Sequence, residues 1–225
     1  MIPRVSVENM RLSDAYTIEH FVPSLTLMYR AALGVFKAVP WQGSTAIVVG
    51  SGNNGGDGFA LACILKAHGL SCTVFTLSQR LSEDSAYYAD QAKKSGVPIH
   101  PFVANCLEGF SIVVDCLLGT GFAGSVRGIY RDAIEAINAS SAYVVSVDIN
   151  SGMNGDTGEA ELAVFSDLTV TIGYVKAGLI AENAGNYIKH LICADIGIVL
   201  LREEGYITEE TCPPWLDLKV LSAIL

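Results

Sequence analysis

Three short segments of the chain combine glycine with oxygen-bearing side chains. They read Gly50-Ser-Gly-Asn-Asn-Gly-Gly-Asp-Gly58, Asp115-Cys-Leu-Leu-Gly-Thr-Gly121 and Asp148-Ile-Asn-Ser-Gly152. Glycines let the backbone approach a phosphate closely, and the free N–H groups at the start of a following helix can bind it. The amide and carboxylate groups could bind a cation or move a proton. These residue types therefore predict a site for a ligand that carries phosphate or ribose.

The first segment contains the pattern G-x-G-x-x-G as Gly50, Gly52 and Gly55. The pattern alone is weak, because a dinucleotide fingerprint also requires an acidic residue at the end of the next strand. Here that strand ends in the run Thr76-Leu-Ser-Gln-Arg80, which has no acid. An ordinary dehydrogenase site is therefore not expected. A merely structural turn is the alternative, but it would not require the polar side chains at positions 53, 54 and 57.

The surrounding sequence alternates short apolar runs with amphipathic segments, which is typical of βαβ units and a mainly parallel sheet covered on both faces. The apolar run Ala46–Val49 reads as a strand, and a helix is expected from Phe59 to His68. Two helices are expected before it, from Ser6 with an apolar stripe through Met10 and Ile18, and from Ser24, which could cap its own helix. Further helices are predicted at 82–95 and 128–138. Further strands are predicted at 72–77, 112–115, 143–147, 168–172 and 191–196.

Ligands of open parallel sheets bind at the carboxyl ends of the strands, where all three glycine-containing segments are expected. Asn54, Asp115 and Ser151 could then converge on one cation. One carboxylate with two neutral oxygens suits a monovalent ion better than calcium or magnesium. Two alternatives stay open at this point: Asp115 could simply accept hydrogen bonds from nearby backbone N–H groups, and Asp148 could be a turn former.

The amino-acid composition and charge argue against some classes of function. The chain has 225 residues, 51% hydrophobic and 16% charged, with a formal net charge of −9. An acidic protein of this kind is not expected to bind nucleic acid. No apolar run approaches the length of a membrane span, and no signal peptide is seen, so no membrane association is expected. Six scattered cysteines fit reduced thiols in a cytoplasmic protein. We expect one domain over residues 1–225.

The order and spacing of the motifs resemble those of the NAD(P)H-hydrate epimerases, or YjeF N-terminal domains. The most specific motif is Asn53-Asn-Gly-Gly-Asp-Gly58. The others are Val7-Glu-Asn-Met10 through Asp14, Leu27-Met-Tyr-Arg-Ala31, the Asp115 to Gly121 segment, Ser146-Val-Asp-Ile-Asn-Ser-Gly152 continuing to Gly158, Thr169-Val-Thr-Ile-Gly173, Lys176-Ala-Gly-Leu179 and Asp195-Ile-Gly-Ile198.

The resemblance implies a three-layer α/β/α Rossmann-like fold, often dimeric, so we expect a homodimer. It also implies that the enzyme interconverts the R and S hydrates of NADH and NADPH (NADHX and NADPHX), so that a separate S-specific dehydratase can restore the cofactor. By the same resemblance Asn54, Asp115 and Ser151 would bind K⁺. The hydrated cofactor would contact Asn53, Asn54, Gly55, Gly56, Asp57, Gly119, Thr120, Gly121, Phe122, Ala123, Gly124, Ser125 and Asp148.

Asp148 is the hypothesis for the catalytic residue, either as an acid/base or as a group that orients the substrate. Two departures from the family pattern bear on activity, because Tyr29 stands where a glutamate is usual and Asn150 where a proline is usual. The alternative function is a catalytically silent nucleotide-binding or scaffolding domain of the same fold. The sequence leaves open whether NADHX or NADPHX is preferred.

Overall fold

The computed structural model describes residues 1–224 and contains one parallel sheet of eight strands. Its strand order is β11-β9-β7-β6-β5-β2-β3-β4. The central strands are fully buried and mostly apolar, as a sheet covered on both faces requires. The strands are β2 (Thr45–Val49), β3 (Cys72–Thr76), β4 (Ile99–Pro101), β5 (Ile112–Cys116), β6 (Tyr143–Val147), β7 (Leu168–Ile172), β9 (Leu191–Asp195) and β11 (Leu216–Ser222).

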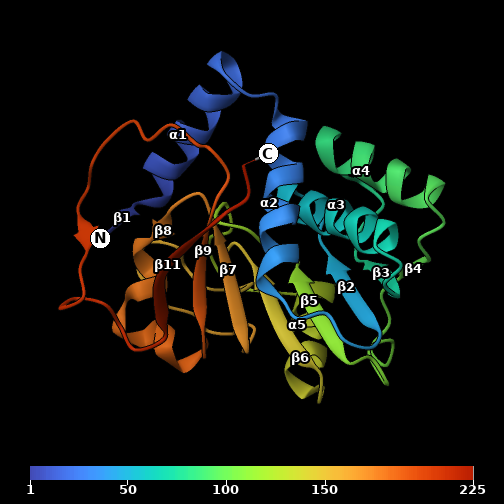
Figure 1. The fold of residues 1–225 in the computed structure, drawn as a ribbon. Coiled ribbons are helices and arrows are strands. Elements are labelled where there is room, and N and C mark those ends of the chain that lie inside the picture. The colour runs from blue at the N-terminus through green and yellow to red at the C-terminus, as the bar shows by residue number, and fades with distance from the viewer. Residues whose placement is uncertain (225) are drawn as a thin grey trace.

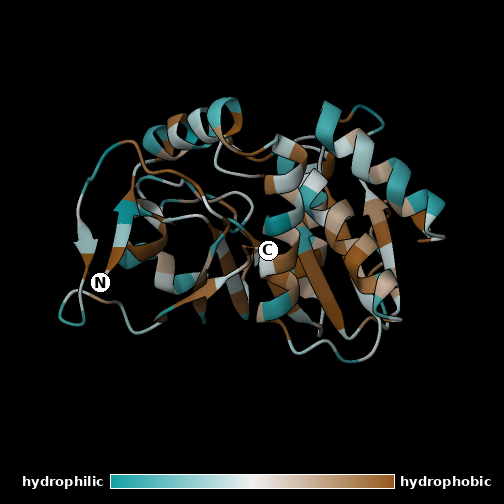
Figure 2. Ribbon diagram, turned by 45° about the horizontal axis from the view of Figure 1, so that its top comes forward, coloured by the Kyte–Doolittle hydropathy of each residue, from teal (hydrophilic) through white to brown (hydrophobic). Residues whose placement is uncertain are grey.

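Helices cover both faces of this sheet, which confirms the predicted three-layer α/β/α architecture (Figure 1). Alternate residues of β2 pack on opposite faces of the sheet. Ile47 and Val49 pack with α2 (Ser24–Ala38), α3 (Asn53–Ala67) and α4 (Glu83–Lys94), whereas Ala46 and Val48 pack with α5 (Ile129–Ala139). Hydrophobic residues are accordingly concentrated in the strands and on the sheet-facing sides of the helices (Figure 2).

The start of α3 differs from the sequence prediction. The glycine-rich segment was expected to be a turn with the helix beginning at Phe59, but the helix begins at Asn53. Glycine has low intrinsic helix propensity, so the sequence pattern favoured a turn. Packing decides otherwise, because a Cβ at Gly58 would lie 2.7 Å from Val49 Cγ1 and 3.0 Å from Cys116 Cβ. Glycine thus allows α3 to approach the sheet closely.

The two N-terminal helices also depart from expectation in detail. The predicted start of α1 (Val7–His20) near Ser6 is confirmed, and Ser6 caps the helix by accepting a hydrogen bond from the Asn9 N–H. Ser24, however, is the first residue of α2, and the cap position is Pro23. The predicted apolar stripe of α1 is wrong beyond Met10. Its buried positions are mostly polar, and Ile18 is 37% exposed.

A second, three-stranded sheet lies beside the N-terminus and was not predicted. It pairs β1 (Ile2–Val5) in parallel with β8 (Val175–Lys176) and antiparallel with β10 (Tyr206–Ile207). Two short 3₁₀ helices, at Ala177–Ile180 and Glu182–Asn186, follow β8. The chain after Arg202, which had no clear sequence pattern, supplies β10 and β11. Within residues 1–224, the helices are too short or too polar to cross a membrane.

Gly50, between β2 and α3, packs closely against the end of β5 and the loop after it, and a substitution at Gly50 tests this packing. Its N–H donates to the Cys116 carbonyl at 3.0 Å, and an added Cβ would overlap the Leu117 carbonyl oxygen. Gly50→Ala should therefore lower the free energy of unfolding by about 2–3 kcal/mol in chemical denaturation. Gly121→Ala is the control, because its Cβ meets open space. Equal stability of the two variants would contradict this packing account.

Candidate active site

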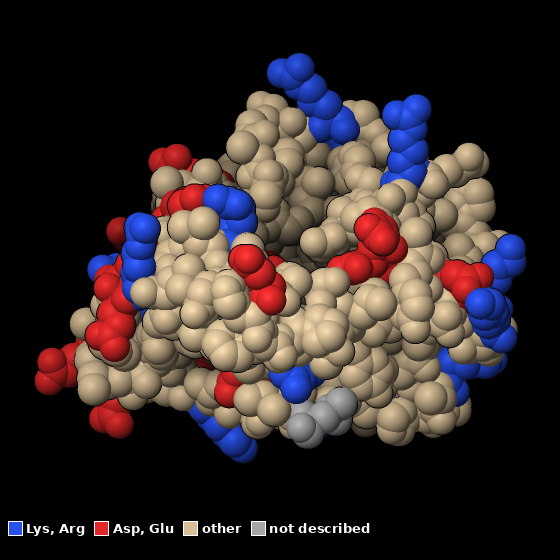
Figure 3. Space-filling model, turned by 90° about the horizontal axis from the view of Figure 1, so that it is seen from above, with Lys and Arg blue, Asp and Glu red and all other residues tan. Residues whose placement is uncertain are grey.

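A cavity of about 690 Å³ opens at the carboxyl ends of the parallel strands. Helices α1, α2 and α3 form part of its wall, and the loop after β5 forms another part. Viewed from above, the molecule is hollowed there, and acidic side chains lie beside the hollow (Figure 3). Four carboxyl groups line it, those of Asp14, Asp57, Asp84 and Asp148. In the described part of the chain, its cationic lining residues are Arg11 and Lys176.

The structure brings most of the predicted ligand-contacting residues to this cavity. The lining includes Asn53, Asn54, Asp57, Gly119, Thr120, Gly121, Phe122, Ala123 and Asp148. Asn53 is held by a hydrogen bond of 2.8 Å from the Ser82 hydroxyl to its Oδ1. Because Gly52 caps α3 without a side-chain hydrogen bond, the first N–H groups of this helix stay available to an anion.

Four of the predicted residues lie outside this lining. Gly55 and Gly56 are buried in α3, where a Cβ at Gly56 would lie 2.6 Å from Met28 Sδ. Both glycines permit close packing, and their contact with the ligand stays a prediction. Gly124 lines a smaller neighbouring cavity of about 270 Å³ that shares Phe122 and Ala123. Ser125 is exposed and lines neither cavity.

Asp148 occupies a strained turn at the end of β6. Its φ of 68° is the one positive value among non-glycine residues 1–224. Such a conformation costs free energy and persists where surrounding contacts impose it. The Asp148 N–H donates to the Val170 carbonyl at 2.8 Å, and its Oδ1 accepts from the Ile172 N–H at 3.1 Å. The turn thus presents the carboxylate to the cavity, where its side chain is 18% exposed.

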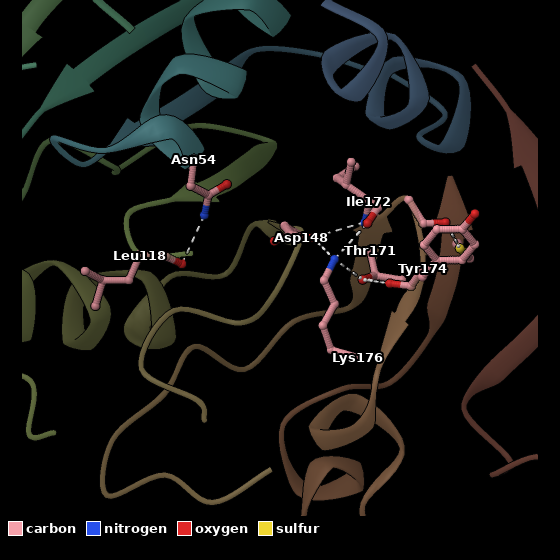
Figure 4. A network of polar contacts seen from close by, with 9 residues as sticks. Asn54, Leu118, Asp148, Thr171, Ile172, Tyr174 and Lys176 are labelled. Atoms are coloured by element: carbon pink, nitrogen blue, oxygen red, sulfur yellow. Dashed lines mark hydrogen bonds and ion pairs between the residues drawn. The ribbon is translucent and has the colours of Figure 1, made fainter. Parts of the chain in front are cut away.

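Lys176 of β8 forms an ion pair with Asp148 (Figure 4). The lysine side chain is only 1% exposed, and its Nζ also donates to the Ile172 carbonyl at 2.8 Å and to Thr171 Oγ1 at 3.2 Å. Burial of an ammonium group is costly unless it is paired and hydrogen-bonded, as it is here. Sequence reasoning quoted Lys176 only within a family motif and gave it no role. The sequence feature that could have indicated its buried role is a lysine placed among apolar residues.

The carboxylate of Asp115 lies below the cavity floor and is completely buried. Its Oδ1 accepts hydrogen bonds from the Leu117 N–H and the Ser151 hydroxyl, and its Oδ2 accepts from the Ser151 N–H and the Ser146 hydroxyl. Burial raises the pKa of Asp115, while these hydrogen bonds oppose the rise. Asp115 thereby joins the end of β5 to the turn that carries Asp148 and Ser151.

The three predicted cation ligands come together through the backbone of Leu118. Asn54 Nδ2 donates to the Leu118 carbonyl at 3.0 Å, and the Leu118 N–H donates to Ser151 Oγ at 2.9 Å. Asn54 Oδ1 is buried and has no hydrogen-bond partner within residues 1–224. A buried oxygen of this kind requires a partner, and a bound cation would supply one. The donor set therefore fits a monovalent cation.

The two residues that depart from the family pattern lie outside the cavity lining. Asn150 is buried, and its Nδ2 donates to the Val164 carbonyl at 2.8 Å and to Ser166 Oγ at 3.0 Å, while its Oδ1 accepts from Thr169 Oγ1 at 2.6 Å. These bonds fix the turn between Asp148 and Ser151. Tyr29 packs against the hydrophobic core on α2, outside the cavity lining.

The lining carboxyl groups differ in their surroundings. Burial raises the pKa of Asp57 well above its ordinary value, and the negative charges of Asp148 and Asp14 raise it further. Burial also raises the pKa of Asp14, as does Asp148, whereas Lys176 lowers it. Of Asp14, Asp57 and Asp148, Asp148 is the one that is bonded to Lys176. The cavity therefore holds both an ion-paired carboxylate and carboxyl groups that keep a proton more readily.

Comparison with known proteins identifies the family of this chain. The family model described as "YjeF-related protein N-terminus" matches residues 24–178. An NAD(P)H-hydrate epimerase of Limosilactobacillus fermentum is 36% identical over 85% of this chain and 95% of the relative. One of Rhodopirellula baltica is 34% identical over 90% of this chain and 88% of the relative.

A longer relative and a solved structure extend the comparison. A bifunctional NAD(P)H-hydrate repair enzyme of Coxiella burnetii is 37% identical over 84% of this chain, which spans 40% of that relative. A yeast protein of known crystal structure shares the fold, with a TM-score of 0.72 over 90% of this chain and 96% of the yeast chain, at 20% identity. The chain therefore belongs to the family of YjeF-related N-terminal domains.

Proposed function

We propose that this protein is an NAD(P)H-hydrate epimerase, which interconverts the R and S hydrates of NADH and NADPH. The observation that carries the proposal is the ion-paired carboxylate of Asp148, presented to the cavity by a strained turn beside the nucleotide-binding elements. Relatives of nearly the same length bear this activity in their names.

The chemistry of the substrate explains why a carboxylate is required. The hydrated ring carbon carries both a hydroxyl group and the ring nitrogen, so the nitrogen lone pair can assist loss of the hydroxyl. Loss of water and its return to the other face invert this carbon. Each step moves one proton, and a positioned carboxyl group can accept or donate it. Asp148 takes this acid/base role, and Lys176 fixes the orientation of its carboxylate.

The rest of the dinucleotide is bound through backbone N–H groups, which do not contribute to the acidic net charge. The uncapped N-terminus of α3 presents N–H groups to a phosphate, and the loop from Gly119 to Ala123 can follow the phosphates or a ribose. This arrangement leaves the hydrated ring to lie near Asp148.

Asn54, Asp115 and Ser151 would hold K⁺ beneath this loop. The ion would satisfy the unpartnered Asn54 Oδ1 and order the Leu118 backbone that leads into Gly119. Its effect on catalysis would be to fix the shape of the ligand-binding loop.

The expected biological partner is an S-specific NAD(P)HX dehydratase. Bifunctional repair enzymes of Coxiella burnetii and Archaeoglobus fulgidus match this chain over less than half of their length, which leaves room for a second activity in the same polypeptide. The epimerase would convert the R hydrate, which the S-specific dehydratase cannot use, into the S hydrate. The homodimer and the cytoplasmic location stay predictions.

Epimerisation of purified S-hydrate of NADH tests the proposed function. The wild-type protein in potassium buffer should form the R epimer faster than the spontaneous reaction, as followed by chromatography. Asp148→Asn should lower kcat by about 10²-fold or more, because the amide cannot exchange a proton. Asp132→Asn, the same change at an exposed position of α5, should leave kcat unaltered. A folded wild-type protein without acceleration would instead support the catalytically silent binding domain.

Thermal unfolding in potassium or sodium chloride at equal ionic strength tests the cation site. At a tenfold excess over the dissociation constant, K⁺ should stabilise the protein by about 1.4 kcal/mol, which raises Tm by roughly 3–6 °C. Asn54→Ala should abolish the difference between the salts. The neighbouring Asn53→Ala should keep it, since Asn53 Oδ1 is bonded to Ser82. Identical wild-type Tm values in the two salts would refute the site.

A further inference from the structure

Helix α1 is attached to the protein by an unusual polar face. Asn9, Ser13 and Thr17 follow one another at intervals of four residues, and all three are buried. They bond to the extended segment 199–202. Asn9 Nδ2 donates to the Arg202 carbonyl at 2.8 Å, Ser13 Oγ accepts from the Leu201 N–H at 3.1 Å, and Thr17 Oγ1 accepts from the Val199 N–H at 2.9 Å. Directional bonds at three successive turns fix the rotation of the helix about its axis.

The fixed rotation turns a second face of α1 toward the cavity. Met10, Asp14 and Ile18, again at intervals of four residues, all line it. Asp14 lies in the middle of the helix, so neither end of the helix dipole acts on its carboxyl group. Within residues 1–224, no protein group donates a hydrogen bond to this carboxyl, which leaves it available to a ligand. Asp14 is thus a half-buried acid that is aimed at the site without a structural partner.

The groups around Asp14 come from several elements. Asp148 follows β6, Lys176 belongs to β8, and Asp57 belongs to α3; Arg11, on the same helix, is paired with Glu8 at 2.8 Å. Arg202, on the packed segment, acts on Glu8. Burial and the negative charge of Asp148 raise the pKa of Asp14, and Lys176 lowers it. Asp14 therefore lies within electrostatic reach of the same ion pair that the substrate ring must approach.

The other lining carboxyls are less suited to donate a proton to the substrate. Asp148 is bonded to Lys176. Asp57 lies on the turn of α3 that carries Asn54, a proposed ligand of the cation. Asp84 lies in the first turn of α4, at the N-terminus of that helix. Among the four lining carboxyl groups, Asp14 is the one that is not ion-paired, not at a helix N-terminus and not beside a proposed cation ligand.

We propose that Asp14 is a second catalytic residue, which donates a proton to the departing hydroxyl group of the hydrated ring while Asp148 serves the incoming water. The proposal rests on the epimerase activity proposed above. It assigns to α1 the task of carrying one of the two proton-transfer groups.

The steps balance without another reactant. The bond between the hydrated carbon and its hydroxyl oxygen breaks, the proton of Asp14 joins this oxygen, and water leaves as the nitrogen lone pair forms a C=N⁺ bond. Water then adds to the opposite face, and its proton passes to the Asp148 carboxylate. Asp14 is left ionised and Asp148 protonated. The reverse reaction, or exchange with solvent, restores the first state.

Asp14→Asn tests this role in the full-length protein. We expect kcat to fall by about 10²- to 10⁴-fold with a much smaller change in KM, because the amide keeps the shape but lacks the proton. For the wild type, kcat/KM should be bell-shaped with pH, since one carboxyl must be protonated and the other ionised. The variant should keep the acid limb and lose the alkaline limb. Formate should partly restore the rate of Asp14→Ala.

Glu19→Gln is the matched control, because it removes one negative charge from an exposed position of the same helix. It should keep both kcat and the alkaline limb. Thermal unfolding of each variant shows whether α1 stays in place. An active wild type together with an Asp14→Asn variant of unchanged kcat and unchanged pH profile would overturn the role of Asp14 alone. A wild type that does not accelerate epimerisation would overturn both this role and the proposed function.

Discussion

The site depends on the buried carboxylate of Asp115. A carboxyl group with no exposure to solvent must find its hydrogen-bond donors within the protein, and Asp115 finds them at Ser146, Leu117 and Ser151. The donors come from β6, from the loop after β5 and from the turn after β6. Satisfying one buried group therefore fixes the relative positions of three chain segments at the edge of the sheet.

The strain at Asp148 follows from this arrangement. Ser151 is held by Asp115 on one side, and Asn150 is held by Ser166 and Thr169 on the other, so the turn between β6 and these residues has little freedom. Asp148 adopts a positive φ within it and meets Lys176, whose own burial is compensated by Thr171 and Ile172. A carboxylate that is held by several neighbours keeps its position when substrate binds, which is the preorganisation that proton transfer requires.

Sequence reasoning predicted what local pattern and motif order determine. The apolar runs 46–49 and 112–114 predicted two parallel strands, which the structure has as β2 and β5, and the predicted strand ends located Asp115 and Asp148. It failed where packing overrides local preference. The glycines at 55, 56 and 58 lowered the helical signal, yet α3 includes them, because the Gly50 backbone and neighbouring side chains lie too close to leave room for a Cβ. The pair of Lys176 with Asp148 and the bonds of α1 to segment 199–202 join distant residues, so no spacing in the sequence indicates them.

The central claim is that the protein breaks and re-forms the bond between the hydrated ring carbon and its hydroxyl oxygen. Incubation of the unlabelled S-hydrate with the enzyme in H₂¹⁸O, followed by mass spectrometry of the early R product, measures this directly. We predict that the R epimer carries one ¹⁸O atom at the rate at which it forms, after the spontaneous reaction is subtracted. An R epimer that forms at the enzymatic rate and keeps its original oxygen would contradict the account, because inversion would then have occurred without loss of water.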